Sequence, residues 1–111
     1  MQVVNIDYIP GKEFQILGLV RGSTIQSKHL GNDIMSGLKT LVGGELTAYN
    51  DMLEEARTIA TSRMTDQANA LGADAIINVR FTTSSIISGA SEILAYGTAV
   101  KFEHTEDSIL F

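Results

Sequence analysis

The stretch Glu45–Gly72, ELTAYNDMLEEARTIATSRMTDQANALG, decides the fold of this 111-residue chain. Its apolar side chains recur at intervals of three and four residues, which places them on one face of a helix. They are Leu46, Tyr49, Leu53, Ala56, Ala60, Met64, Ala68 and Leu71. Gly72 follows the last of them, at a position suited to a left-handed C-cap. The pattern therefore predicts a long helix from Glu45 to Leu71.

Extended segments lie on both sides of this helix. Before it, Glu13–Thr24 alternates residue by residue in the manner of a strand. After it, Ala75–Ile87 and Glu92–Phe102 are two extended runs joined by turn-forming residues at 88–91, which predicts a β-hairpin. These segments form the main part of the expected sheet.

Two shorter elements complete the expected order. Gln2–Asn5 precedes the turn pair Pro10 and Gly11 and reads as a small edge strand. Apolar residues between His29 and Val42 again recur at helical spacing, so a first, shorter helix is expected there, weakened by its glycines. Residues 1–111 are thus predicted to form a single α+β domain, a two-layer structure with an antiparallel sheet and a long helix packed on it.

The composition excludes several classes of function. Apolar residues make up 44% and charged residues 19%, a globular balance, and the net charge of −5 opposes binding to nucleic acid or to anionic membrane surfaces. The absence of cysteine removes disulfides, thiolate metal sites and cysteine nucleophiles. No targeting segment or membrane span is apparent, and a cytoplasmic, bacterial-type location is expected.

The two sides of the predicted sheet lead us to expect a homo-oligomer. Uninterrupted alternation gathers large apolar residues on the side expected to face the long helix: Phe14, Ile16, Val20, Ile77, Val79, Phe81, Leu94, Tyr96, Val100 and Phe102. The other side then carries Leu17, Leu19, Ile76, Ile86, Ile93, Ala95, Gly97 and Ala99. That side is too apolar for solvent, and its small residues would let another layer approach closely. We expect a partner subunit to cover it through Leu17, Leu19, Ile86 and Ile93, with cover by the first helix as the alternative.

Candidate metal ligands are few. His29 and Asp33 are four residues apart and would share a helical face, offering two ligands to a divalent metal ion, so that symmetry copies would have to complete the site. The alternative interpretation makes Asn32 or Asp33 a helix cap. The acidic stretch around His104 reads as a solvated tail.

Arg57 is the remaining candidate. It follows Glu54 by three residues, the spacing of a surface ion pair, and the alternatives are a bond to a neighbouring subunit or to a small anionic ligand. No nucleophile elbow, phosphate loop or dinucleotide fingerprint appears, so the sequence gives no support to an enzyme.

Several motifs together resemble the YbjQ-like family. They are Gly18–Gly22, Lys28–Ile34, Gly43–Leu46, Tyr49, Ala56 with Arg57, Arg63 with Met64, Leu71–Ala75 and Gly97–Val100. The resemblance covers nearly the whole chain. It implies a putative heavy-metal-binding domain, a fold similar to the dodecin subunit and assembly as a homopentamer, in which pockets between subunits offer a place for small ligands.

Overall fold

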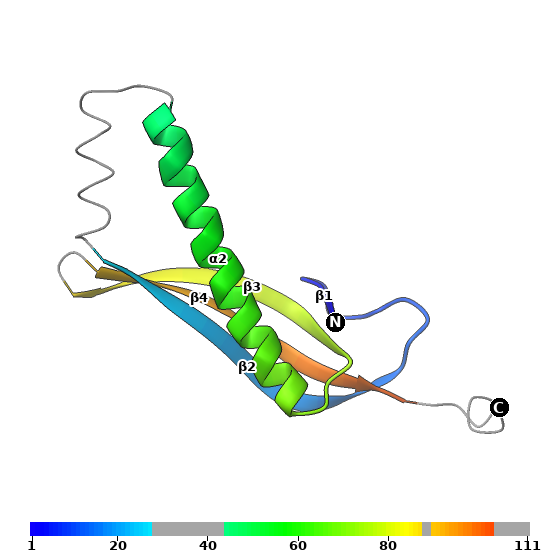
Figure 1. Cartoon of the computed structure of the whole chain (residues 1–111). Helices are drawn as coiled ribbons and strands as arrows, with labels where there is room; N and C mark the ends of the chain where they lie inside the picture. Colours follow the sequence, from blue (N-terminus) through cyan, green and yellow to red (C-terminus); the bar gives the residue numbers. More distant parts are fainter. Residues whose placement is uncertain (28–43, 88–89, 104–111) are drawn as a thin grey trace.

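The computed structural model describes residues 1–27, 44–87 and 90–103. In chain order its elements are β1 (Gln2–Val3), β2 (Phe14–Ser27), α2 (Gly44–Ala70), β3 (Ala75–Ile87) and β4 (Ala90–Phe102) (Figure 1). The edge strand, the main strand, the long helix and the hairpin predicted from the sequence are therefore confirmed. The shorter helix predicted between His29 and Val42 lies outside the described residues.

The four strands form one sheet in the order β1-β3-β4-β2, with α2 packed across one of its faces (Figure 1). Strands β3 and β4 form the predicted antiparallel hairpin, and β2 pairs antiparallel with β4 along its whole length. The prediction of a purely antiparallel sheet was wrong at one edge, because β1 pairs parallel with β3 through Gln2 and Val3. The molecule is thus an α+β domain with a mixed sheet.

The end of α2 has the predicted left-handed cap. Gly72 adopts a φ of 78°, its amide donates to the Asn69 carbonyl at 3.0 Å, and the Ala73 amide donates to the Ala68 carbonyl at 3.1 Å. This pair of bonds is a Schellman motif, which satisfies carbonyls that the helix itself leaves free. It turns the chain directly into β3, where the Asp74 carboxylate accepts a bond from the Phe102 amide at 2.7 Å.

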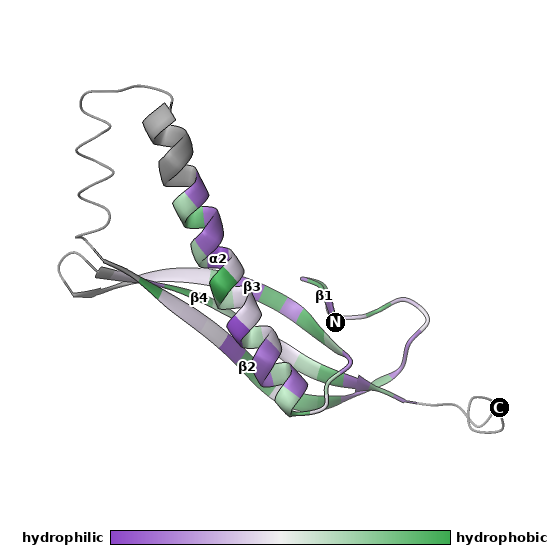
Figure 2. Cartoon of the chain, in the orientation of Figure 1, coloured by the Kyte–Doolittle hydropathy of each residue, from purple (hydrophilic) through white to green (hydrophobic). Residues whose placement is uncertain are grey.

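Small side chains allow α2 to lie very close to the sheet. The helix contributes Ala56, Ala60, Met64 and Ala68, and Figure 2 shows hydrophilic and hydrophobic residues alternating along it. The sheet contributes the second half of this core: Val20, Ile76, Val79, Ile93, Ala95 and Ala99, with Leu17 partly buried beside them. Glycines at 22 and 97 lie on the same face, where an added β-carbon would meet backbone or side-chain atoms closer than 3.0 Å.

The assignment of the sheet faces from the sequence was wrong for all of β4 and for the first residues of β2 and β3, whereas Leu19, Val20 and Val79 lie on the sides expected. A β-bulge in β2 and another in β3 explain the change of face within those two strands. In β2 the register shifts between Ile16 and Gly18, and in β3 it shifts between Ile77 and Arg80, where Asn78 has a φ of 54°. Each extra residue exchanges the faces of all residues beyond it, so regular alternation could not be carried through the strand. The small residues Ala95 and Ala99, which were expected to meet a partner, instead meet α2 of the same chain.

Among residues 1–27, 44–87 and 90–103, the face away from α2 is covered at one end only. There Ile9, from the segment between β1 and β2, is buried against Ala75, Ile77 and Val100, and Phe14 and Phe102 pack against this group. The rest of that face, toward the β3–β4 turn, is exposed or half-exposed along the described parts of all three long strands. It is the part of the fold from which the candidate site is built.

Candidate functional site

We call the uncovered part of the sheet the open face. By register and by position relative to the two bulges, it comprises Ile16, Leu19, Arg21, Ser23 and Ile25 of β2, Arg80, Thr82 and Ser84 of β3, and Glu92, Leu94, Tyr96 and Thr98 of β4. Three large apolar side chains follow β2, the outer strand: Ile16 is 70% exposed, Leu19 68% and Ile25 63%. Burying each of them would gain roughly 1.5–3 kcal/mol, so together they favour a covering surface.

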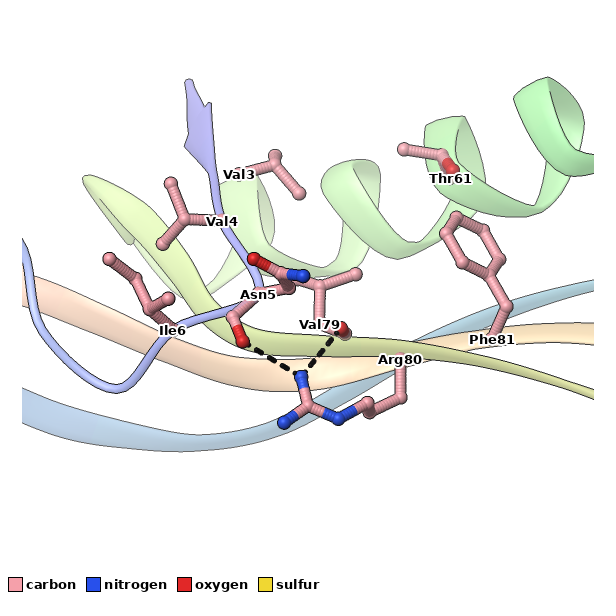
Figure 3. A pocket seen from close by; sticks show the side chains of 8 residues that line it. All are labelled: Val3, Val4, Asn5, Ile6, Thr61, Val79, Arg80 and Phe81. Carbon is pink, nitrogen blue, oxygen red and sulfur yellow. Dashed lines mark hydrogen bonds between the residues drawn. The ribbon is translucent and has the colours of Figure 1, made fainter.

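Two arginines flank a tyrosine across the open face. Tyr96 of β4 is the register partner of Arg80 in β3 and of Arg21 in β2, so the three residues form one row across the sheet. Adjacent members of such a row lie on strands about 4.8 Å apart. Figure 3 shows the Arg80 side chain on the opposite side of β3 from Phe81, with its Nη1 donating to the carbonyls of Asn5 and Val79 at 2.9 and 3.0 Å. The middle of the open face is therefore cationic and aromatic.

Side chains of α2 reach the outer edge of β2 beside this row. The Arg21 amide donates to Gln67 Oε1 at 2.7 Å, and Arg63 Nη1 donates to the Ser23 carbonyl at 2.5 Å. Arg63 thus bonds to the strand. A free strand edge pairs readily with other chains, and these two bonds occupy part of it. The open face is consequently better suited to face-on packing than to strand addition at this point.

A polar hollow lies at the same edge. It has a volume of about 510 Å³ and is lined by Arg21, Gly22, Ser23, Arg63, Gln67, Glu92 and Leu94. Guanidinium groups and an amide are donors that suit a carboxylate or phosphate, whereas the Glu92 carboxylate disfavours one. Most of its lining belongs to the open face, so any surface that covers this face would also close the hollow.

A larger, mainly apolar groove lies on the helix side of the sheet at its other edge. It has a volume of about 710 Å³ and is lined by Val3, Val4, Asn5, Ile6, Thr61, Val79, Arg80 and Phe81 (Figure 3). The Phe81 ring, on a residue that is 51% exposed, stands toward Thr61 of α2 and also borders a neighbouring hollow that includes Glu54 and Arg57. These walls offer contact area but few free polar groups.

The predicted metal ligands are not placed by the structure. His29 and Asp33 lie outside the described residues, as does His104. Within residues 1–27, 44–87 and 90–103, no three histidine, aspartate or glutamate side chains gather in a way that would hold a metal ion.

Arg57 forms the ion pair that its spacing predicted. Its Nη1 lies 2.5 Å from Glu54 Oε1, and both side chains are well exposed, at 46% and 72%. An exposed pair of this kind contributes little to stability, between zero and about 1 kcal/mol. Arg57 remains accessible from the hollow beside Phe81.

The predicted interface residues divide between the two faces. In one copy, Ile93 is buried beneath α2 and Leu17 is partly buried against the same core, on the face opposite to Leu19. Leu19 lies on the open face, and the Ile86 side chain is outside the description. Sequence reasoning placed Ile16 and Tyr96 on the helix side and did not single out Ile25. The glycine at 18 and the asparagine at 78 within strands were the signals of the two bulges.

Comparison with known proteins identifies the family. Residues 1–103 match the YbjQ family model, whose description is "Putative heavy-metal-binding". The chain belongs to the YbjQ-like family. Among its relatives, the UPF0145 protein of Alkaliphilus metalliredigens is 65% identical over 92% of this chain and 99% of its own length. The UPF0145 protein of Methanosarcina acetivorans is 62% identical over 91% and 96%.

The fold has a counterpart among solved structures. A DUF74-family protein of unknown function from Pediococcus pentosaceus superposes with a TM-score of 0.65, covering 93% of this chain and 98% of the other at 16% identity. Identity this low supports the shared fold alone. In the described part of the chain, no helix of this YbjQ-like protein is both long and apolar enough to cross a membrane.

Proposed function

We propose that the chain functions as a self-assembling homo-oligomer, a homopentamer of dodecin-like subunits, whose copies bury the open face. The observation that carries the proposal is the run of exposed Ile16, Leu19 and Ile25 beside half-exposed Leu94 and Tyr96 on a single sheet face. Contiguous apolar surface of this kind is typical of protein–protein contacts. On the opposite face, α2 covers Val20, Ile93, Ala95 and Ala99.

The elongated shape of the chain agrees with this interpretation. Its radius of gyration is 18.5 Å, against about 13 Å for a compact domain of this length. Figure 1 shows that the first turns of α2 rise away from the sheet, so this end of the helix lacks a packing partner among the described strands. A neighbouring copy would supply one.

Binding of a divalent metal ion by His29 and Asp33 is part of the same proposal. The family description supports metal binding, and the small number of ligands in one chain limits how a metal could be held. Two ligands per chain suffice only if copies related by symmetry bring their pairs together, and nitrogen and oxygen donors suit zinc, nickel or copper better than softer metals. Assembly is therefore a precondition for the metal site.

A small-ligand binder with pockets between subunits is the second candidate. The hollow lined by Arg21, Arg63 and Gln67 favours it, because this hollow is open in one copy and offers two guanidinium groups to an anion. Such a ligand would occupy the boundary between copies.

Native mass spectrometry of the purified protein tests both candidates in one measurement. We expect a main species at five times the 12.0 kDa of one chain. Retained mass that a chelator removes supports the metal, and retained mass of an organic anion supports the second candidate. A species of one chain at micromolar concentration would contradict self-assembly.

A further inference from the structure

We propose that the outer surface of α2 of a second copy covers the open face, so that the copies assemble head to tail. This inference rests on the proposed self-assembly and specifies which two surfaces meet. We call the second surface the outer stripe. It consists of Asp51, Glu55, Thr58, Ser62, Asp66 and Asn69.

The outer stripe is a continuous band on the helix. Its members follow one another at three- and four-residue intervals, all are exposed, and they lie opposite the core-facing Ala56, Ala60 and Met64. From Asp51 to Asp66 it runs about 22 Å along the helix. From Leu19 to Ile25 the open face runs about 20 Å along β2. The two surfaces therefore match in length.

The charges of the two surfaces are complementary. The outer stripe contains three carboxylates, those of Asp51, Glu55 and Asp66, and no cation. The described part of the open face carries the guanidinium groups of Arg21 and Arg80 against the single carboxylate of Glu92. Arginine and carboxylate form short, charge-assisted hydrogen bonds, which strengthen when a covering layer excludes water.

The shapes also fit. Thr58 and Ser62 form the middle of the outer stripe, so a shallow section lies between its acidic parts. Tyr96 and Leu94 form the middle of the open face, with Tyr96 between Arg21 and Arg80 and Leu94 between Ser23 and Thr82. Small polar side chains on the helix would leave room for the tyrosine ring.

A face-to-face pair of two open faces is disfavoured. Each copy would bring its own arginine row toward the row of the other, and like charges repel in a water-poor contact. When the open face of one copy meets the outer stripe of another, the first copy still has its outer stripe free and the second still has its open face free. Such contacts continue from copy to copy and close when the rotation allows a ring. In this arrangement the hollow beside Arg63 is closed only by the neighbouring copy.

Charge reversal tests the assignment of the surfaces. We compare a chain with Arg21→Glu and Arg80→Glu, a chain with Glu55→Arg and Asp66→Arg, and a chain with all four changes. Light scattering at micromolar concentration should show loss of the assembled species for each pair alone and its return for the combined chain. Glu13→Arg, an exposed reversal outside both surfaces, is the matched control and should leave the assembled mass unchanged. Circular dichroism verifies that every variant is folded.

Cysteine cross-linking gives a second test that does not depend on charge, because the chain has no cysteine of its own. A chain carrying both Arg21→Cys and Glu55→Cys should form a ladder of covalent multimers on oxidation, whereas either change alone should not. Cross-linking of the Arg21→Cys chain alone would overturn the inference, because it would mean that open faces meet each other. An unaltered chain that is monomeric would refute self-assembly itself. If the assembled species keeps its mass in both charge-reversal variants, only the pairing of these two surfaces is refuted.

Discussion

Gly22 of β2 lies directly against the backbone of Met64 in α2. A β-carbon at position 22 would overlap the Met64 amide nitrogen and the Ala60 carbonyl oxygen, and it would lie 2.8 Å from the Arg63 carbonyl carbon. These are backbone atoms of a helix and cannot move aside as the end of a flexible side chain can. Position 22 therefore fixes how closely the helix approaches the sheet.

Gly22→Ala should destabilise the fold strongly for its size. Because the added methyl group must push the helix away from the sheet, we expect a loss of about 1–3 kcal/mol in the free energy of unfolding. Urea denaturation measures it. Ser23→Ala is the matched control, because Ser23 bonds Arg63 through its carbonyl rather than its side chain. Equal midpoints for the two variants would contradict the close contact.

Gly72→Ala should weaken the junction between α2 and β3. The φ of 78° at this position is unfavourable for alanine, at a cost of roughly 1–2 kcal/mol. Gly72→Asn keeps the same bonds and should cost less, since asparagine tolerates the left-handed region. Thermal melting shows which of the two variants is more stable. A lower melting temperature for the asparagine variant than for the alanine variant would count against the Schellman cap.

Asn78→Val should be more harmful than Asn78→Gly. Asn78 has a φ of 54° within the β3 bulge, a conformation in which a β-branched residue is strained and glycine is not. We expect the valine variant to unfold at lower urea concentration than the unaltered chain and the glycine variant to remain close to it. If valine is tolerated as well as glycine, the bulge does not set the faces of β3.

These bulges also mark the limit of what the sequence predicts. Helical spacing predicted α2 and its cap, and turn residues predicted the hairpin, because both signals depend on residues close together in the sequence. The faces of the sheet depend on register, and one extra residue at Gly18 or Asn78 reverses all that follows. Ile93 was placed on the other side for a different reason: β4 has no bulge, but its side with the small Ala95 and Ala99, rather than its bulkier side, packs under α2.

The candidate site could be predicted from the sequence even less well than the faces of the sheet. Arg21, Arg80 and Tyr96 are far apart in the sequence, and only the pairing of three strands brings them into one row. The capping of β2 by Gln67 and Arg63 depends likewise on where α2 crosses the sheet. The Glu54–Arg57 pair, by contrast, follows from spacing within one helix.

Zinc, nickel or copper should raise the melting temperature of the assembled protein if His29 and Asp33 bind metal. A ligand at one hundred times its dissociation constant stabilises the folded state by about 2.7 kcal/mol, enough to shift melting by several degrees. His29→Ala should abolish the shift while leaving the subunit count unchanged. If none of the three ions changes the melting temperature, the proposal that His29 and Asp33 bind a metal is contradicted.

The central claim is that the open face is covered by another copy of the chain. Sedimentation velocity over a micromolar concentration series, with the unaltered chain beside Leu19→Lys, tests it most directly. Leu19 is 68% exposed in one copy, so lysine there should leave the single subunit folded. We predict a large species for the unaltered chain and a shift toward the 12.0 kDa subunit for the variant. A 12.0 kDa species for both, or an assembly equally stable in both, would contradict the account.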